Sequence, residues 1–236
     1  MPDDGKKNKF TRTWLSVEMA SVEYGEAHRF QLDLVAARHA GTILQDIVLF
    51  LEHPPVFTLG RRGGLDNLKV SRDFLIKHGV PIIQAERGGD ITYHGPGQLI
   101  VYPIVDLEKA GMGVMDYVHN LEEVMIRTAA DFLVESERNK INRGVWVVDR
   151  KLGSIGITIR KGISFHGLAL NVNTDLAPFD WVHPCGLRGT RMTSLEQEKE
   201  QIVPTDRVRE SAKGHLKNVF GVELSAKTKH QIEGLL

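Results

Sequence analysis

Three short apolar segments, joined by tight connections, restrict the fold of this 236-residue chain more than any other feature. They are residues 145–148, 152–159 and 163–172. Turn-forming residues separate them, at Asp149-Arg150 and at Arg160-Lys161-Gly162. Strands joined by such short connections pair as an antiparallel meander, because neighbouring parallel strands need a long crossover. This part of the chain therefore predicts antiparallel strands of a sheet.

Strand-like and helix-like segments alternate along the rest of the chain. Apolar runs predict strands at 13–17, 46–52, 80–84 and 99–106. Helical spacing predicts helices at 24–39, at 71–78 with Ser71 as the cap, at 115–133, and a last one capped by Thr205. Residues 177–193 lack periodicity and are expected to form a loop, and a short C-terminal helix is expected. Since helices and strands are interspersed, we predict an α+β fold with a mixed, mostly antiparallel sheet.

Two prolines interrupt the segment that follows the apolar run at 46–52. Proline cannot donate a hydrogen bond to a sheet ladder, so Pro54 and Pro55 argue against a central strand. We therefore expect residues 53–60 to form a turn or the edge of a sheet.

Composition limits the class of protein. With 42% hydrophobic residues the chain can bury one core, so we expect a flexible segment at 1–13 and one domain at 14–236. Basic and acidic residues number 30 each, which does not favour nucleic acid or a membrane surface as a partner. The single cysteine excludes an intrachain disulfide, and no apolar leader or membrane-spanning run is present. We expect a cytoplasmic monomer.

One stretch is rich in both glycine and hydrogen-bonding side chains. It reads Arg87-Gly88-Gly89-Asp90-Ile91-Thr92-Tyr93-His94-Gly95-Pro96-Gly97-Gln98. Glycines let a backbone approach another group closely, and a plain turn needs only two or three special residues. Although a long turn before a strand is the simpler interpretation, the density of polar side chains favours a binding loop.

Cys185 is the only cysteine of the chain and therefore the one candidate for a thiol nucleophile. Most lone cysteines are small buried hydrophobes, but Pro184 and Gly186 place this one in a loop. A thiol reacts as thiolate, so it would need a cationic or basic neighbour. The candidates are Lys151, His94, His166 and His183. No histidine pair has the helical spacing of metal ligands, so we expect no metal site.

Five ordered motifs together resemble the lipoyl/octanoyltransferases, which belong with the lipoate and biotin ligases. They are the stretch from Arg87 to Gln98, His53-Pro54-Pro55-Val56-Phe57-Thr58-Leu59-Gly60, Lys151-Leu152-Gly153-Ser154-Ile155-Gly156, Ser164-Phe165-His166-Gly167-Leu168-Ala169-Leu170-Asn171-Val172-Asn173, and Pro184-Cys185-Gly186. The resemblance covers roughly residues 14–220, and five motifs in order are far more specific than one. It implies the fold of those ligases, with helices packed mainly on one side of the sheet.

The resemblance also implies an activity, which is the first step of endogenous lipoate biosynthesis. An octanoyl (or lipoyl) group would pass from acyl carrier protein to a lysine of a lipoyl domain, in 2-oxoacid dehydrogenases or the glycine cleavage H protein. Cys185 would carry the acyl group as a thioester, and Lys151 would lower the pKa of that thiol and move protons. The substrate site would comprise Arg87, Gly88, Gly89, Asp90, Ile91, Thr92, Tyr93, His94, Ser154, Ile155, Gly156, Gly167, Leu168 and Ala169. A thioester donor is already activated, so no cofactor is expected.

Alternative functions remain open at this point. An ATP-dependent lipoate or biotin ligase shares the fold, but it does not depend on a cysteine. A relative could use Cys185 to move octanoyl or lipoyl between two protein domains, and an inert module that binds acyl carrier protein would not need both Lys151 and Cys185. His94 or His166 could replace Lys151 as the base. Chain-length preference must come from the closed end of the pocket, which the sequence does not reveal.

Overall fold

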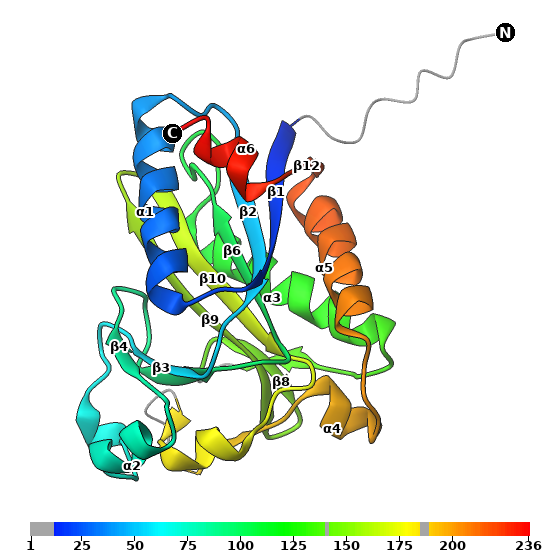
Figure 1. Ribbon diagram of the computed structural model, residues 1–236. Coiled ribbons are helices and arrows are strands. Elements are labelled where there is room, and N and C mark those ends of the chain that lie inside the picture. The colour runs from blue at the N-terminus through cyan, green and yellow to red at the C-terminus, as the bar shows by residue number, and fades with distance from the viewer. Residues whose placement is uncertain (1–11, 140–141, 185–188) are drawn as a thin grey trace, which may run out of the picture.

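The apolar runs of the sequence form one large twisted sheet with helices on both faces (Figure 1). The computed structural model describes residues 12–139, 142–184 and 189–236. Within them, the main sheet has the order β12-β1-β2-β6-β10-β9-β8-β7, and β11 pairs with β9. The strands are β1 (Arg12–Ser21), β2 (Ile47–Glu52), β6 (Gln98–Ile104), β7 (Glu137–Arg138), β8 (Gly144–Val147), β9 (Arg150–Arg160), β10 (Ile163–Asn171), β11 (Arg191–Met192) and β12 (Val222–Lys227).

The pairing is mixed and mostly antiparallel, as predicted. The predicted meander is β8-β9-β10, and β10 continues antiparallel onto β6 and β6 onto β2. Among the described strands of this sheet, the parallel pairings are those of β1 with β12 and β2 on one side, and of the short β11 with β9 on the other. The edge strand β12 has no strong apolar alternation and was not predicted.

A second sheet lies below the main one in Figure 1, with the order β4-β3-β5. Its strands are β3 (Val56–Leu59), β4 (Ile82–Gln84) and β5 (Ile91–His94). β3 pairs on both sides, so the prediction of a turn or edge at residues 53–60 is wrong. Pro54 and Pro55 precede the strand and therefore remove no ladder donor from it. β5 forms within the stretch that was expected to be a loop.

Two apolar layers hold the helices against the main sheet. α3 (Val114–Asp131) and α5 (Thr205–Phe220) cover one face, while α1 (Tyr24–Ala40) and the short α6 (Lys229–Glu233) cover the other. Strand β6 serves both layers, because alternate side chains point to opposite faces: Leu99 and Val101 join the first, Ile100 and Tyr102 the second. The α+β class is confirmed, and two of the three longest described helices share a face.

Of the two N-terminal helix caps that the sequence predicted, one is confirmed. α2 (Arg72–Lys77) is capped as predicted, since the Ser71 hydroxyl accepts a hydrogen bond from Phe74 N at 3.1 Å. Thr205 is the first residue of α5 rather than its cap, because Pro204 occupies the cap position. The expected loop at 177–193 contains a 3-10 helix (Ala177–Trp181) and β11, and is followed by α4 (Leu195–Lys199).

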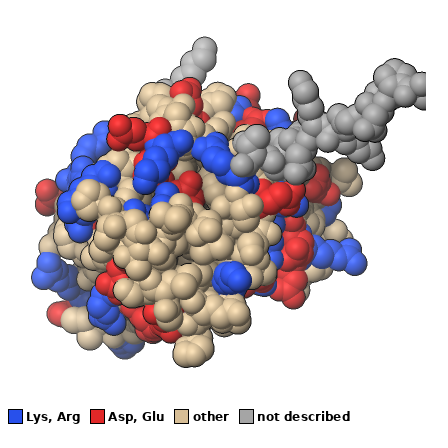
Figure 2. Space-filling view, turned by 90° about the horizontal axis from the view of Figure 1, so that it is seen from above, with Lys and Arg blue, Asp and Glu red and all other residues tan. Residues whose placement is uncertain are grey.

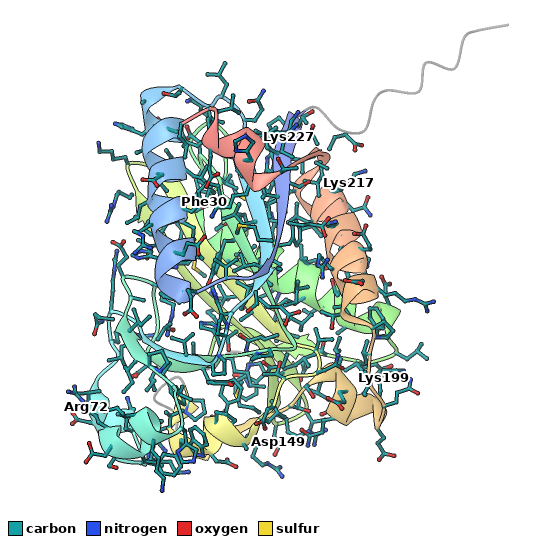
Figure 3. All side chains as sticks on the ribbon, in the orientation of Figure 1. Phe30, Arg72, Asp149, Lys199, Lys217 and Lys227 are labelled. Carbon is teal, nitrogen blue, oxygen red and sulfur yellow. The ribbon has the colours of Figure 1, made fainter. Side chains whose placement is uncertain are left out.

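Charges are dispersed on the end of the molecule that Figure 2 shows, where basic and acidic side chains lie among neutral ones. In Figure 3, Phe30 of α1 points toward the sheet, and Arg72 and Asp149 mark the opposite, lower end of the molecule. None of the helices in the described part of the chain has the length and apolar character needed to cross a membrane.

Candidate active site

A cavity of about 280 Å³ lies where the β9–β10 hairpin meets β5 and the start of α1. Most of the residues expected to bind substrate line it. These are Arg87, Gly88, Gly89, Asp90, Thr92, His94, Ser154, Ile155, Gly156, Gly167, Leu168 and Ala169, and Lys151 lines it as well. Residues of three separate sequence motifs therefore line one cavity.

Two residues of the expected substrate site lie outside the cavity lining. Ile91 and Tyr93 alternate with Thr92 and His94 along β5, so their side chains point to the opposite face of the strand. There they pack in a separate apolar cluster that includes Phe57. Their structural contribution is to hold β5 in place.

Arg87 fastens the glycine-rich stretch to β3. Its Nη2 donates to Thr58 O at 2.6 Å and its Nε to Thr58 Oγ1 at 3.1 Å, while Nη1 donates to Gly88 O at 3.0 Å. A side chain at Gly60 would place its Cβ 2.4 Å from Gly89 O, so only glycine permits this approach. The guanidinium is buried and forms part of the wall of the cavity.

Both ring nitrogens of His94 are engaged by neighbours in the protein. Gln98 donates its Nε2 to Asn171 Oδ1 at 2.8 Å, so its Oε1 must accept, and His94 Nδ1 donates to it at 2.7 Å. His94 Nε2 is then the acceptor that faces the Thr58 hydroxyl at 3.4 Å. Burial, with the nearby His53 and Arg87, holds the pKa of His94 well below its ordinary value, so the ring is neutral.

Lys151 lies at one end of the cavity with only 1% of its surface exposed. Its Nζ donates to Asn142 Oδ1 and to Arg143 O, the latter at 2.9 Å. The buried carboxylate of Glu122 on α3 accepts the Gly144 N–H at 3.0 Å and so fixes the same segment. The ammonium group is therefore held in one place at the cavity wall.

Cys185 lies outside the described residues, but the chain on either side of it is described. On one side His183 N donates to Asn67 O at 2.8 Å, and Asn67 Nδ2 donates to Asp90 Oδ2 at 2.9 Å. On the other side β11 pairs with β9 at Lys151, and Thr193 N donates to Lys151 O at 2.9 Å. The second attachment is made directly to the cavity-lining Lys151, and the first reaches the cavity-lining Asp90 through Asn67.

Comparisons with known proteins agree on one family. The model of the lipoyl protein ligase A/B catalytic domain matches residues 23–217. An octanoyltransferase of Desulfotalea psychrophila is 52% identical over 184 residues, which is 77% of this chain and 82% of the relative. That of Syntrophobacter fumaroxidans is 40% identical over 220 residues, 93% of this chain and 96% of the relative. The chain belongs to the octanoyltransferase family. The predicted family is confirmed, and the chain is an enzyme of acyl transfer.

Solved structures support the fold of this octanoyltransferase-family chain. A putative lipoate protein ligase from T. acidophilum with bound lipoic acid has a TM-score of 0.71 at 18% identity, covering 95% of this chain and 92% of that one. A lipoate-protein ligase A bound with ATP has a TM-score of 0.72 at 17% identity, with the same coverage. The predicted ligase-like fold is confirmed.

Sequence reasoning missed several residues that line the cavity of this octanoyltransferase-family chain. They are Tyr24, Tyr102, Val118, Asn142 and Ile157. Tyr24 and Tyr102 occupy positions of a helix and a strand where an apolar side chain is expected. Only their hydroxyl groups could have indicated a site. Among the described residues, no three His, Cys, Asp or Glu side chains gather as metal ligands would.

Proposed function

We propose that this protein transfers an octanoyl group from acyl carrier protein to a lysine of a lipoyl domain, through a thioester on Cys185. The acceptors would be lipoyl domains of 2-oxoacid dehydrogenases and the glycine cleavage H protein. Residues 14–236 would act as one catalytic domain, in the cytoplasm and without a cofactor. The observation that carries the proposal is the cavity that has Lys151 at one end and three of the family motifs in its walls.

The chemistry proceeds in two exchanges. The Cys185 thiolate attacks the carbonyl of the donor thioester, the bond to the carrier sulfur breaks, and the carrier thiol leaves with a proton. The amine of the acceptor lysine then attacks the new thioester, forms the amide and expels the Cys185 thiolate. Lys151 is the group that we assign to hold and return the protons of these steps.

The geometry favours Lys151 over the histidines for this role. Lys151 Nζ lies at the cavity wall, and its backbone oxygen accepts a hydrogen bond from Thr193 in the chain that returns from Cys185. His94 is neutral and its two ring nitrogens are engaged by Gln98 and Thr58. His166 lies opposite Ile157, six residues along β9 from Lys151.

The carrier protein would dock at basic residues near the cavity. Five basic residues are candidates to steer it, namely Arg61, Arg62, Arg150, Arg160 and Lys161. Two of them are already paired, since Arg150 contacts Glu198 at 2.9 Å and Arg160 contacts Glu86 at 2.7 Å. Arg62 lines the cavity and is our first choice for docking, with Arg61 beside it and Lys161 as a further candidate. A pair that is already neutralised within the protein attracts an acidic partner less.

A nucleotide-free transfer assay tests the proposed function. Octanoyl-acyl carrier protein and an apo lipoyl domain are incubated with the enzyme after apyrase treatment and without magnesium. We expect octanoylation of the acceptor lysine, read by intact mass, and no product when that lysine is replaced. A strict requirement for ATP would instead make the protein a ligase.

A further inference from the structure

The end of the cavity farthest from Lys151 is lined by polar rings. His166 on β10 lies opposite Ile157 on β9, so six residues of strand separate it from Lys151, which is roughly 20 Å. Tyr24, the first residue of α1, stacks against His166 with ring centroids 6.4 Å apart. Both side chains line the cavity, and their exposures are only 1% for His166 and 2% for Tyr24. This end would face the tail of a bound acyl chain.

Three polar atoms at this end have no hydrogen-bond partner among the described residues. They are both ring nitrogens of His166 and the hydroxyl of Tyr24. Most buried polar side-chain atoms in proteins are paired, because an unpaired one has lost water without compensation. The contrast with His53 is clear, since its ring nitrogens lie 2.6 Å from Val22 O and 2.8 Å from the Tyr102 hydroxyl.

The backbone at His166 is also unusual. Its φ of 57° is left-handed, although His166 is not glycine and lies within a strand. Its N–H leaves the ladder and donates to Gln31 Oε1 of α1 at 2.7 Å. A strained residue held by a dedicated partner is typical of binding sites. The fold thus maintains His166 in a conformation that costs free energy.

The chemistry of these groups is that of neutral hydrogen bonding. Burial lowers the pKa of His166 to about 3 and raises the pKa of Tyr24 to about 12. At neutral pH the imidazole therefore offers one donor and one acceptor, and the phenol offers both. Such a set suits a hydroxyl group or a water molecule.

We propose that His166 and Tyr24 form a hydrogen-bonding subsite, which accepts a hydroxyl on the last carbon of the acyl chain and limits the length of an unsubstituted chain. The proposal rests on the proposed function of the cavity as the acyl site. A chain that stops short leaves these groups accessible to water. A longer apolar chain displaces that water and leaves the three polar atoms unpaired, which opposes its binding.

The test compares two acyl groups that have the same number of heavy atoms, nonanoyl and 8-hydroxyoctanoyl, each supplied on acyl carrier protein. Tyr24→Phe should lower the ratio of 8-hydroxyoctanoyl to nonanoyl transfer about three- to tenfold, the usual effect of one hydrogen bond. His166→Asn should change the ratio in the same direction, since asparagine tolerates a left-handed backbone. The matched control is Tyr117→Phe, which removes a buried hydroxyl that donates to Pro103 O at 3.1 Å outside the cavity lining.

An unchanged ratio in Tyr24→Phe would overturn the subsite. If the transfer of both acyl groups rises equally in that variant, the ratio is also unchanged, and the Tyr24 hydroxyl acts only as a steric wall. Calorimetric binding of nonanoic and 8-hydroxyoctanoic acids gives the same ratio without any transfer. Octanoyl transfer by the wild type in the same series reports on the proposed function separately, so the two failures are distinguishable.

Discussion

Replacing Gly144 by alanine should damage the site through the strand that holds Lys151. Gly144 begins β8 with a φ of 120°, a conformation that L-residues rarely adopt. An alanine Cβ would lie 2.2 Å from Gly153 O in β9 and 3.0 Å from Lys151 Cε. The first neighbour is backbone and cannot move away without separating two paired strands.

The expected loss of stability follows from two terms. Backbone strain at this φ costs about 1–3 kcal/mol, and the steric clash of the alanine Cβ costs about the same. We therefore expect the free energy of unfolding to fall by roughly 3 kcal/mol. That would lower the urea midpoint by about 1 M. To relieve the overlap, the segment at 142–144 must move away from β9, and Lys151 Nζ would lose its contact with Arg143 O. Octanoyl transfer should therefore fall at least about tenfold at a temperature where the variant is folded.

Urea unfolding followed by circular dichroism measures the first effect, and the transfer assay measures the second. Gly214→Ala is the matched control, because Gly214 lies inside α5 with open space around its Cβ position. That variant should be more stable by up to about 1 kcal/mol and fully active. A Gly144→Ala protein with the urea midpoint and transfer rate of the wild type would refute the role given to this strand.

Three further predictions concern the walls, the buried histidines and the rim. Arg87→Lys should reduce both the free energy of unfolding and the rate of transfer, because one ammonium group cannot replace the guanidinium contacts with Thr58 and Gly88. Wild-type stability and activity in this variant would show that these contacts do not hold the cavity wall in place. Burial lowers the pKa of His53 from 6.5 to about 4, so between these two pH values the unfolded chain binds a proton that the folded chain does not. The free energy of unfolding should therefore fall by roughly 3 kcal/mol as the pH drops from 6.5 to 4. His53→Gln should make the free energy of unfolding less dependent on pH in this range. Arg62→Ala should slow acyl-enzyme formation at low salt and have little effect at high salt. If the variant and the wild type form the acyl-enzyme at the same rate at every salt concentration, Arg62 does not steer the carrier protein.

The sequence predicted those parts of the fold that depend on strong apolar runs and short connections. The meander β8-β9-β10 followed from both signals, and the strand at 99–106 followed from its length and composition. In the edge strand β12 only the first residue, Val222, is buried, and the side chains after it are half-buried or exposed, so its apolar pattern is weak. The central place of β3 was missed because a proline signal acts only where the proline itself would pair.

The site was predictable only where its residues form contiguous motifs. Arg87, His94 and Lys151 belong to such motifs and meet at the cavity. Tyr24 and Asn142 reach the same cavity from the start of a helix and from a connection, where local sequence gives no sign of the neighbours they meet. The unpaired ring of His166 depends on a backbone angle and a contact with Gln31, neither of which sequence patterns reveal.

Intact mass spectrometry of the acyl-enzyme tests whether Cys185 carries the acyl group. Wild-type protein is incubated with octanoyl-acyl carrier protein alone, beside Cys185→Ala and Lys151→Arg. We expect an octanoyl adduct on the wild type that hydroxylamine removes, and no adduct on Cys185→Ala. In Lys151→Arg we expect an adduct that passes poorly to the lipoyl domain. Transfer by Cys185→Ala at the wild-type rate would show that Cys185 does not carry the acyl group.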